Sequence, residues 1–357
     1  MKSAFGVKRR IGLCARNSFN ARVTPTCIEV PMRFEYSVTT LTDGPSLAGP
    51  AFGTPKVLDY SKRNRMAFSD WVADSIASQF LTSNFVSAVH LSNPTTSKFA
   101  HPDAWANFVE LFRNGRPHMP QAWADVFGPL QSGTVDDLVI VGQIGQSLDG
   151  RVATATGHSK YVNCPAGIDH LHRLRALVDI VVVGVGTALA DDPQLTVRHV
   201  CGPQPVRAVI DPRGRLGTNA KVFADDGVRR ILITAEGSRA APPEGVEVVV
   251  LPSEDGNIAP SAIACFLRGA GMRRVLIEGG ADTVSRFLTA RCLDRLHVTV
   301  APVMLGMGGP GIALPPLERA DQAHRMPTRV HKIGDDVLFD CDLSGQRLTL
   351  GTAKKST

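Results

Sequence analysis

The chain has 357 residues, of which 43% are hydrophobic and 20% are charged, as in an ordinary globular protein. This length suits one large domain with a smaller accompanying segment. No apolar run approaches the roughly 20 residues that cross a bilayer, so we expect no membrane association. The formal net charge is +6, and residues 1–28 hold six basic residues and no acid, so the remainder is neutral overall. We therefore expect no nucleic-acid partner.

The basic start and the cysteines bear on location and metal binding. The first residues fit a disordered tail, a misassigned start or an Arg-rich organellar transit peptide. Seven cysteines are scattered along the chain, with no C-x-x-C pair and no Cys/His spacing typical of zinc. We therefore predict reduced thiols, a cytoplasmic protein and no metal site.

The N-terminal third divides into two segments of different composition. Residues 1–65 are predicted to be a basic tail followed by an irregular segment, because Pro, Gly, Ser and Thr are frequent there. Residues 66–130 are predicted to be a small helical segment of unknown role, with helix starts near Pro102 and Pro120. All three tryptophans lie in it. It either packs on the main domain or serves as a lid or partner surface.

From residue 138 the pattern changes to alternating strands and helices. Strands are predicted at 138–144, 179–183, 206–210, 230–233, 246–251, 273–277, 296–301 and 336–340, and helices at 165–178, 258–268 and 281–290. This alternation predicts one α/β domain over residues 137–343, with a mainly parallel central sheet between two helical layers. Residues 344–357 are predicted to be a C-terminal tail.

Two glycine-containing turns join a predicted strand to a polar segment. One is Glu278-Gly279-Gly280-Ala281-Asp282, and the other is Gly184-Val185-Gly186-Thr187. Free backbone N–H groups at such turns favour an anionic group such as a dinucleotide pyrophosphate. Each turn alone fits an ordinary connection equally well.

Six blocks in order strengthen the interpretation. They are Ser147-Leu148-Asp149-Gly150, Gly157–Ser159, Ala190–Arg198, Gln204–Asp211, Glu278–Gly280 and Ala301–Gly306. In order and spacing they resemble the C-terminal reductase domain of the bacterial bifunctional riboflavin-biosynthesis deaminase–reductase. The resemblance implies a three-layer, dihydrofolate-reductase-like fold over 137–343. It also implies NADPH-dependent reduction of a ribosylamino-pyrimidine 5′-phosphate to its ribitylamino product, and a homodimer.

The resemblance also implies site residues. Substrate would be contacted by Ser159, Arg175, Leu195, Arg198 and Glu278. The dinucleotide would be contacted by Gly145, Tyr161, Thr187, Asp191 and the turn Gly280-Ala281-Asp282-Thr283, with Gly184 and Gly186 beside it. Guanidinium groups suit a sugar phosphate, and a carboxylate can accept from ring N–H groups. No acid–base catalyst is assigned, because hydride transfer depends mainly on positioning.

The chain also departs from this family. Gln143 stands where bifunctional enzymes commonly have Lys, Tyr161 where Trp is frequent, and Pro212 where a polar residue is common. The zinc deaminase elements are absent, so we predict no deaminase activity and no bound zinc. A paralogue that reduces a pterin or a specialised-metabolism pyrimidine is an alternative, and a non-catalytic nucleotide-binding regulator is another. The preference for NADPH or NADH stays open.

The last strands bear on assembly. Residues 296–301 and 337–340 would leave an apolar sheet edge if unpaired, which a second subunit could cover. We therefore predict a homodimer through the reductase domain. We also expect a chain beginning near Thr134 to keep the dimer and cofactor binding.

Overall fold

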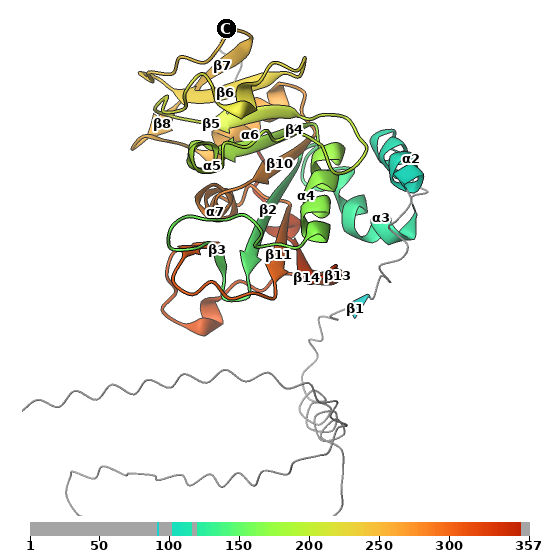
Figure 1. The fold of residues 1–357 in the computed structure, drawn as a ribbon. Coiled ribbons are helices and arrows are strands. Elements are labelled where there is room, and N and C mark those ends of the chain that lie inside the picture. Colours follow the sequence, from blue (N-terminus) through green and yellow to red (C-terminus); the bar gives the residue numbers. More distant parts are fainter. Residues whose placement is uncertain (1–90, 93–101, 116–119, 351–357) are drawn as a thin grey trace, which may run out of the picture. The chain divides into compact units, whose positions relative to one another are not determined.

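A computed structural model describes residues 91–92, 102–115 and 120–350. The predictions for residues 1–65, and for most of 66–101, lie outside these described residues. Within them the dominant feature is one ten-stranded sheet, which runs from β7 at the top of Figure 1 to β13 and β1 at the bottom. Its order is β1-β13-β14-β11-β2-β10-β4-β5-β6-β7.

The strands of this sheet are β1 (Leu91–Ser92), β2 (Val139–Ser147), β4 (Ile180–Gly184), β5 (Val206–Ile210), β6 (Arg230–Ala235), β7 (Val246–Leu251), β10 (Arg274–Glu278), β11 (Arg295–Ala301), β13 (Thr328–Ile333) and β14 (Asp336–Asp342). Neighbours from β11 to β7 are parallel, whereas β14 is antiparallel to both β11 and β13. Two small ribbons pair β3 (Arg151–Ala153) with β12 (Gly309–Pro310) and β8 (Ser253–Glu254) with β9 (Asn257–Ile258).

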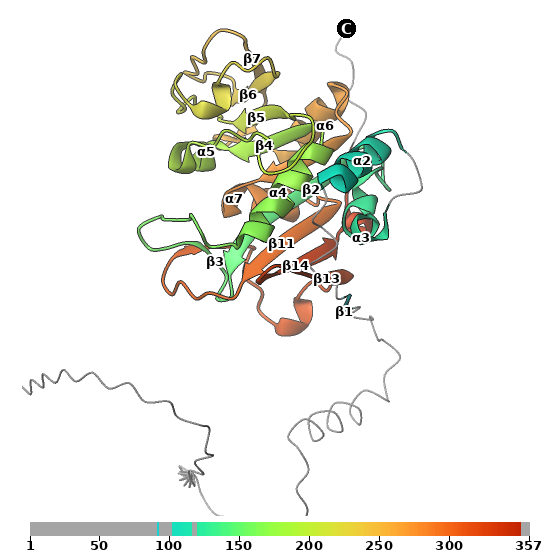
Figure 2. The ribbon, with the colours of Figure 1, turned by 45° about the vertical axis from the view of Figure 1, so that its right-hand side comes forward.

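The helices cover both faces of the sheet. They are α2 (Pro102–Arg113), α3 (Gln121–Phe127), α4 (Pro165–Leu177), α5 (Val185–Asp191), α6 (Pro260–Gly269) and α7 (Ala281–Thr289). Core side chains of α2, α3, α4 and α5 pack with one face, and those of α6 and α7 with the other. Figure 2 shows α4 crossing in front of the sheet. The central strands are buried almost throughout because helices shield both of their faces.

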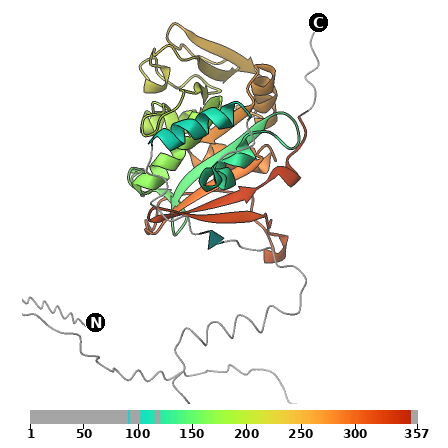
Figure 3. The same ribbon diagram turned by 90° about the vertical axis from the view of Figure 1, so that its right-hand side faces the viewer.

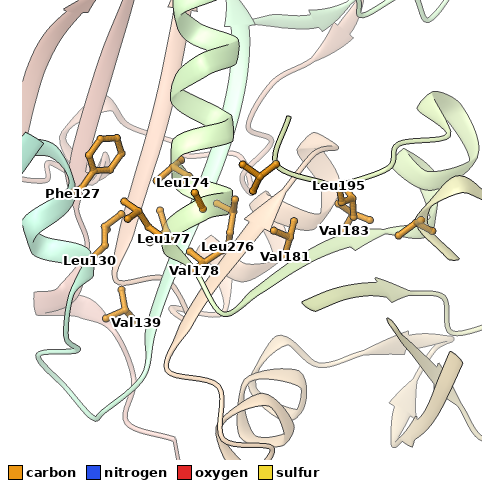
Figure 4. Close-up of a cluster of buried hydrophobic side chains, with 14 of the residues drawn as sticks. Phe127, Leu130, Val139, Leu174, Leu177, Val178, Val181, Val183, Leu195 and Leu276 are labelled. Carbon is orange, nitrogen blue, oxygen red and sulfur yellow. The ribbon is translucent and has the colours of Figure 1, made fainter. Parts of the chain in front are cut away.

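The N-terminal helices share a core with the α/β domain. Phe127 of α3 and Leu130 pack near Leu174 and Leu177 of α4, and the cluster continues to Val139 of β2 (Figure 4). Figure 3 shows α2 and α3, in teal, lying beside the rest of this layer. The two helix starts predicted at Pro102 and Pro120 are close to those observed.

The predicted fold class is confirmed, but the position of the sheet edge differs. The sequence patterns missed β13, so the expected unpaired edge at 296–301 and 337–340 is wrong. β11 is paired on both sides by β14 and β2, and β14 is covered by β13. None of the described helices has the length and apolar character of a membrane span.

Candidate active site

The carboxyl ends of the central parallel strands open into two adjoining cavities. The inner cavity, about 460 Å³, lies between β2, β10 and the start of α4. The outer cavity, about 610 Å³, lies beyond the ends of β4, β5 and β10. Both are lined by Gly186, Thr187 and Gly280, so the glycine turns form their common border. This is the position in which open α/β sheets bind ligands.

Polar contacts between distant segments border the inner cavity. The hydroxyl of Ser159 donates to the Asp191 carboxylate over 3.0 Å, across the cavity. Asn163 also lines it, and its amide donates to Asp336 and to the carbonyl of Thr299. A Cβ at position 145 would overlap the Asn163 side chain, which would have to move to admit it. The β2 wall is therefore set close to the start of α4.

Glu278, the last residue of β10, presents a fixed carboxylate to the inner cavity. Nε of Arg175 donates to one oxygen over 2.9 Å, and Nη2 bonds the other. Nη1 of Arg175 donates to the Thr196 carbonyl over 3.0 Å. Both charged side chains are at least nine-tenths buried. The planar guanidinium thus fixes the plane of the carboxylate and links it to the 194–198 loop.

The loop that follows α5 carries Leu195 and Arg198. Leu195 is fully buried with φ 58°, a left-handed conformation that is costly for a bulky residue. The backbone N–H of Arg198 donates to Nδ1 of His172 over 3.1 Å. The exposed Arg198 guanidinium bonds Gln194 and Thr196 and faces no carboxylate within ion-pair distance among the described residues.

The border between the cavities depends on Thr187. Its hydroxyl accepts from the N–H of Gly280 over 2.6 Å. Gly279 has φ 85°, and a Cβ there would lie 2.6 Å from the Thr187 methyl. A Cβ at Gly184 would overlap the hydroxyl of Thr283. These close approaches leave a narrow backbone cradle at the start of α7, of the kind that suits a pyrophosphate.

The structure brings together most of the predicted site residues. The inner cavity is lined by Gly145, Ser159, Gly186, Thr187, Asp191, Glu278 and Gly280, and the outer cavity by Gly184, Gly186, Thr187, Gly280, Ala281, Asp282 and Thr283. Arg175, Leu195, Arg198 and Tyr161 do not line either cavity, and Tyr161 is 86% exposed with φ 67°. The roles assigned to all these residues stay predictions.

Sequence reasoning missed several lining residues. Asn163 lies just before α4, and Arg213 and Arg215 lie in the turn after β5. Polar residues that directly follow a parallel strand were the available signal for the two arginines. In the part of the chain that the structure describes, no group of three or more His, Cys, Asp or Glu is arranged to hold a metal ion.

Comparison with known proteins connects this geometry to a family. Residues 139–339 match the RibD C-terminal domain. A 2,5-diamino-6-ribosylamino-4(3H)-pyrimidinone 5′-phosphate reductase of Methanothermobacter thermautotrophicus is 32% identical over 216 residues, 56% of this chain and 95% of that protein. The riboflavin biosynthesis protein RibD of Escherichia coli is 30% identical over 210 residues, 55% of this chain and 57% of that protein.

A solved structure is also similar to this chain. The deaminase/5-amino-6-(5-phosphoribosylamino)uracil reductase of Thermotoga maritima superposes with a TM-score of 0.51 at 27% identity, over 57% of this chain and 56% of that one. This chain therefore aligns with about half the length of the Escherichia coli and Thermotoga proteins and with nearly all of the archaeal reductase. On the match over residues 139–339, the chain belongs to the RibD C-terminal domain family.

Proposed function

We propose that this protein is an NADPH-dependent reductase that converts a ribosylamino-pyrimidine 5′-phosphate to its ribitylamino product. The observation that carries the proposal is the Glu278 carboxylate, fixed by Arg175 in a cavity that adjoins a glycine cradle. The archaeal relative is named as a reductase of such a phosphate, and the family membership supports the same chemistry here.

The described residues fit a nicotinamide dinucleotide. The backbone around Gly280 and the first turn of α7 would hold the pyrophosphate, because no side chain intrudes between Thr187 and the glycines. When bound, the reduced dinucleotide supplies the hydride. The chain's part is to place the sugar carbon beside the cofactor in the inner cavity and to keep water out.

Glu278 and Arg198 would bind opposite ends of the substrate. Both oxygens of Glu278 already accept from Arg175, so its remaining lone pairs can accept only in one plane, which suits ring N–H donors. The N–H donors of Arg175 are used in bonds to Glu278 and to the Thr196 carbonyl, whereas the exposed Arg198 guanidinium has free donors. We assign the 5′-phosphate to Arg198 and the orientation of Glu278 to Arg175.

The substituents of the pyrimidine ring, diamino or uracil, are a finer question. The archaeal relative is named for a 2,5-diamino ring, and the Thermotoga protein for a uracil ring. Gln143 pairs with Glu278 across β2 and β10 and lines the inner cavity, so it stands beside the proposed ring site. An amide can donate and accept, so Gln143 accommodates either ring.

The direct test is NADPH oxidation by the purified protein, followed by loss of NADPH fluorescence, with each ring form and with a dihydropterin. Conversion of either ribosylamino-pyrimidine phosphate to its ribitylamino product is expected. Turnover of the pterin alone would support the alternative that this protein is a paralogue that reduces a pterin. Saturable NADPH binding without any turnover would favour the non-catalytic regulator.

Arg198→Ala tests the phosphate assignment. Loss of a charge-assisted contact of about 1.5–3 kcal/mol should raise KM for the phosphorylated substrate roughly ten- to a hundredfold. KM for the dephosphorylated substrate and the affinity for NADPH should stay nearly constant. Arg229→Ala, which removes an exposed arginine paired with Glu247, is the matched control. Equal losses with both substrates would show that Arg198 does not bind the phosphate.

A further inference from the structure

Gln204 begins one of the six blocks that resemble the reductase family, yet it lines neither the inner nor the outer cavity. Its side chain instead bonds the 194–198 loop. Oε1 accepts from the N–H of Val197 over 2.7 Å, and Nε2 donates to the Val197 carbonyl over 2.8 Å. One side chain thus bonds both backbone groups of one residue, as a neighbouring strand does in an antiparallel sheet.

The two peptide groups on either side of Val197 have all their polar atoms bonded to side chains. In the first, Arg175 donates to the carbonyl and Gln204 accepts from the N–H. In the second, Gln204 donates to the carbonyl and His172 accepts from the N–H, which belongs to Arg198. Gln204 is the one partner of the three that bonds both peptide groups. It therefore fixes the planes of both just before Arg198.

The shape of this loop requires such support. Leu195, two residues before Val197, is fully buried with φ 58°, and Asp192 has φ 41°. Left-handed conformations are unfavourable for these residue types and persist only where the surroundings hold the backbone. Among the described residues, no backbone–backbone hydrogen bond involves residues 193–200, so side chains supply the polar contacts of the loop.

Gln204 is itself anchored to the central sheet. The buried Pro205 follows it and restricts it to extended backbone, and Val206 is the first residue of β5. The N–H of Val206 donates to the Asp179 carbonyl over 2.9 Å, and β5 pairs with β4 and β6. The glutamine thus connects the loop to a rigid element.

The fixed loop in turn aims the Arg198 side chain. Nη1 of Arg198 donates to Oε1 of Gln194 over 3.1 Å and to the Thr196 hydroxyl over 2.7 Å. Nε and Nη2 make no hydrogen bond with any described residue. The guanidinium is therefore held from one side and open on the other. A group held in this way loses little freedom when it binds an anion.

We propose that Gln204 is a positioning residue, which holds the loop so that the Arg198 guanidinium meets the 5′-phosphate of the substrate. This rests on the proposed function, because it assumes that Arg198 binds the phosphate. Gln204 would not touch the substrate, because it lines neither cavity and its amide is bonded to Val197. Its loss should weaken phosphate recognition and leave the glycine cradle unchanged.

Steady-state kinetics of Gln204→Met and Gln204→Asn test the proposal. Methionine keeps the length and loses both hydrogen bonds, whereas asparagine keeps the amide and is one methylene shorter. Both variants should raise KM for the phosphorylated substrate roughly three- to tenfold, as expected for lost neutral hydrogen bonds. KM for the dephosphorylated substrate and the affinity for NADPH should stay nearly constant. Gln121→Met is the control, at an exposed position on α3 where the amide bonds Asp125.

Arg198→Ala completes a double-mutant cycle. In that background Gln204→Met should leave the ratio of the two KM values unchanged, because no guanidinium remains to be positioned. An equal effect of Gln204→Met in both backgrounds, or no effect in the wild type, would overturn the positioning role and leave the reductase proposal intact. If Arg198→Ala alone does not change the ratio, the phosphate assignment fails and the positioning role fails with it.

Hydrogen exchange of the full chain, followed by mass spectrometry, needs no substrate. Peptides that cover residues 194–198 should exchange at least about threefold faster in Gln204→Met than in the wild type, because two hydrogen bonds of the loop are lost. Peptides from β5 and α7 should be unchanged. Wild-type exchange of the loop in the variant would overturn the proposal whatever the activity. Absence of turnover with either ribosylamino-pyrimidine phosphate would overturn the proposed function and, with it, the phosphate role of Gln204.

Discussion

At the scale of single residues, the site depends on one buried ion pair. Arg175 and Glu278 lie 103 positions apart, and each oxygen of the carboxylate accepts from the same guanidinium. Removing two charges from water costs several kcal/mol per ion, so such a pair contributes little to stability by itself. The pair instead fixes the orientation of the Glu278 carboxylate. The substrate that we propose would meet a carboxylate that has already lost its rotational freedom.

His172 extends this orientation to the loop that carries Arg198, the residue we propose for the phosphate. It is 2% exposed, accepts the N–H of Arg198 at Nδ1, and stacks on His199 with ring centroids 4.3 Å apart. Burial, together with the charges of Arg175, His199 and Arg198, lowers the pKa of His172 to about 3. The imidazole is therefore neutral at neutral pH, as an acceptor must be.

The lowered pKa of His172 predicts that the free energy of unfolding falls in acid. Its folded pKa lies below its ordinary value of 6.5, so its contribution is complete above pH 6.5 and lost as pH falls towards 3. In this window unfolding takes up close to one proton, about 1.4 kcal/mol per pH unit. His172→Asn keeps an acceptor but cannot titrate, so urea unfolding between those limits should show a shallower decline. His158→Asn, at an exposed position, is the control. Parallel curves for wild type and His172→Asn would contradict the prediction.

The limits of sequence reasoning are visible at these residues. Ser159, Asp191 and Glu278 could be placed at the site because each lies in one of the six blocks, and Thr187 because it ends a glycine turn. That Arg175 would be occupied by Glu278 could not be predicted, since the contact depends on how α4 packs over β10. The same holds for Asn163, whose amide is fixed by Asp336 from a strand far along the chain.

At the scale of elements, α2 and α3 behave as part of the main core. Trp105, Phe108, Trp123 and Phe127 are almost fully buried, and Trp105 donates to the Cys201 carbonyl over 2.8 Å. Their rings are 5.4–6.1 Å apart, centroid to centroid, in offset and edge-on pairs. The expectation that a chain beginning near Thr134 behaves like the full protein is therefore revised. Such a chain would expose the apolar surface that these rings cover.

Phe108→Ala tests the shared core without cutting the chain. Removing a fully buried ring should lower the free energy of unfolding by about 3–5 kcal/mol, in a single transition that includes the α/β domain. Glu110→Ala, exposed on the same helix, should be nearly neutral. If Phe108→Ala instead melts α2 alone, with the main transition unchanged, the helices are a separate unit.

The strands divide by the strength of their pattern. β4 and β10 are short, continuous apolar runs between turn residues, so their existence follows from the sequence. β13 holds only two apolar residues, Val330 and Ile333, among four polar ones, and that weak pattern does not distinguish a strand from a loop. Its pairing with β14 depends on tertiary packing. Because of this pairing β14 is not the edge strand, contrary to the sequence-based expectation.

At the scale of the whole molecule, the predicted homodimer needs a different surface. With β11 and β14 paired inside the sheet, β7 is one edge of it, and Val250 there is 58% exposed. A second apolar surface, the β11 loop surface, consists of Leu148, Val303, Met304 and Met307, which are 63%, 38%, 74% and 88% exposed.

The β11 loop surface is held in place by Asp149. Its carboxylate accepts from Ser147, from the N–H of Leu305 over 3.1 Å and from the N–H of Gly306 over 2.7 Å. These hydrogen bonds, first that of Ser147, lower the pKa of Asp149 to about 2, so the carboxylate stays ionised and keeps these contacts well into the acid range. Large side chains held exposed on a fixed loop are typical of an interface.

We expect the homodimer to form through the β11 loop surface. Burying both methionines would contribute about 3–6 kcal/mol, so the double change Met304→Glu and Met307→Glu should weaken association more than a hundredfold. Analytical ultracentrifugation should then show a monomer, while Val250→Glu on β7 should stay dimeric. The reverse result would place the interface at the β7 edge, where an unpaired strand can add a second copy. A wild type that sediments as a monomer at all concentrations would show that the predicted dimer does not form.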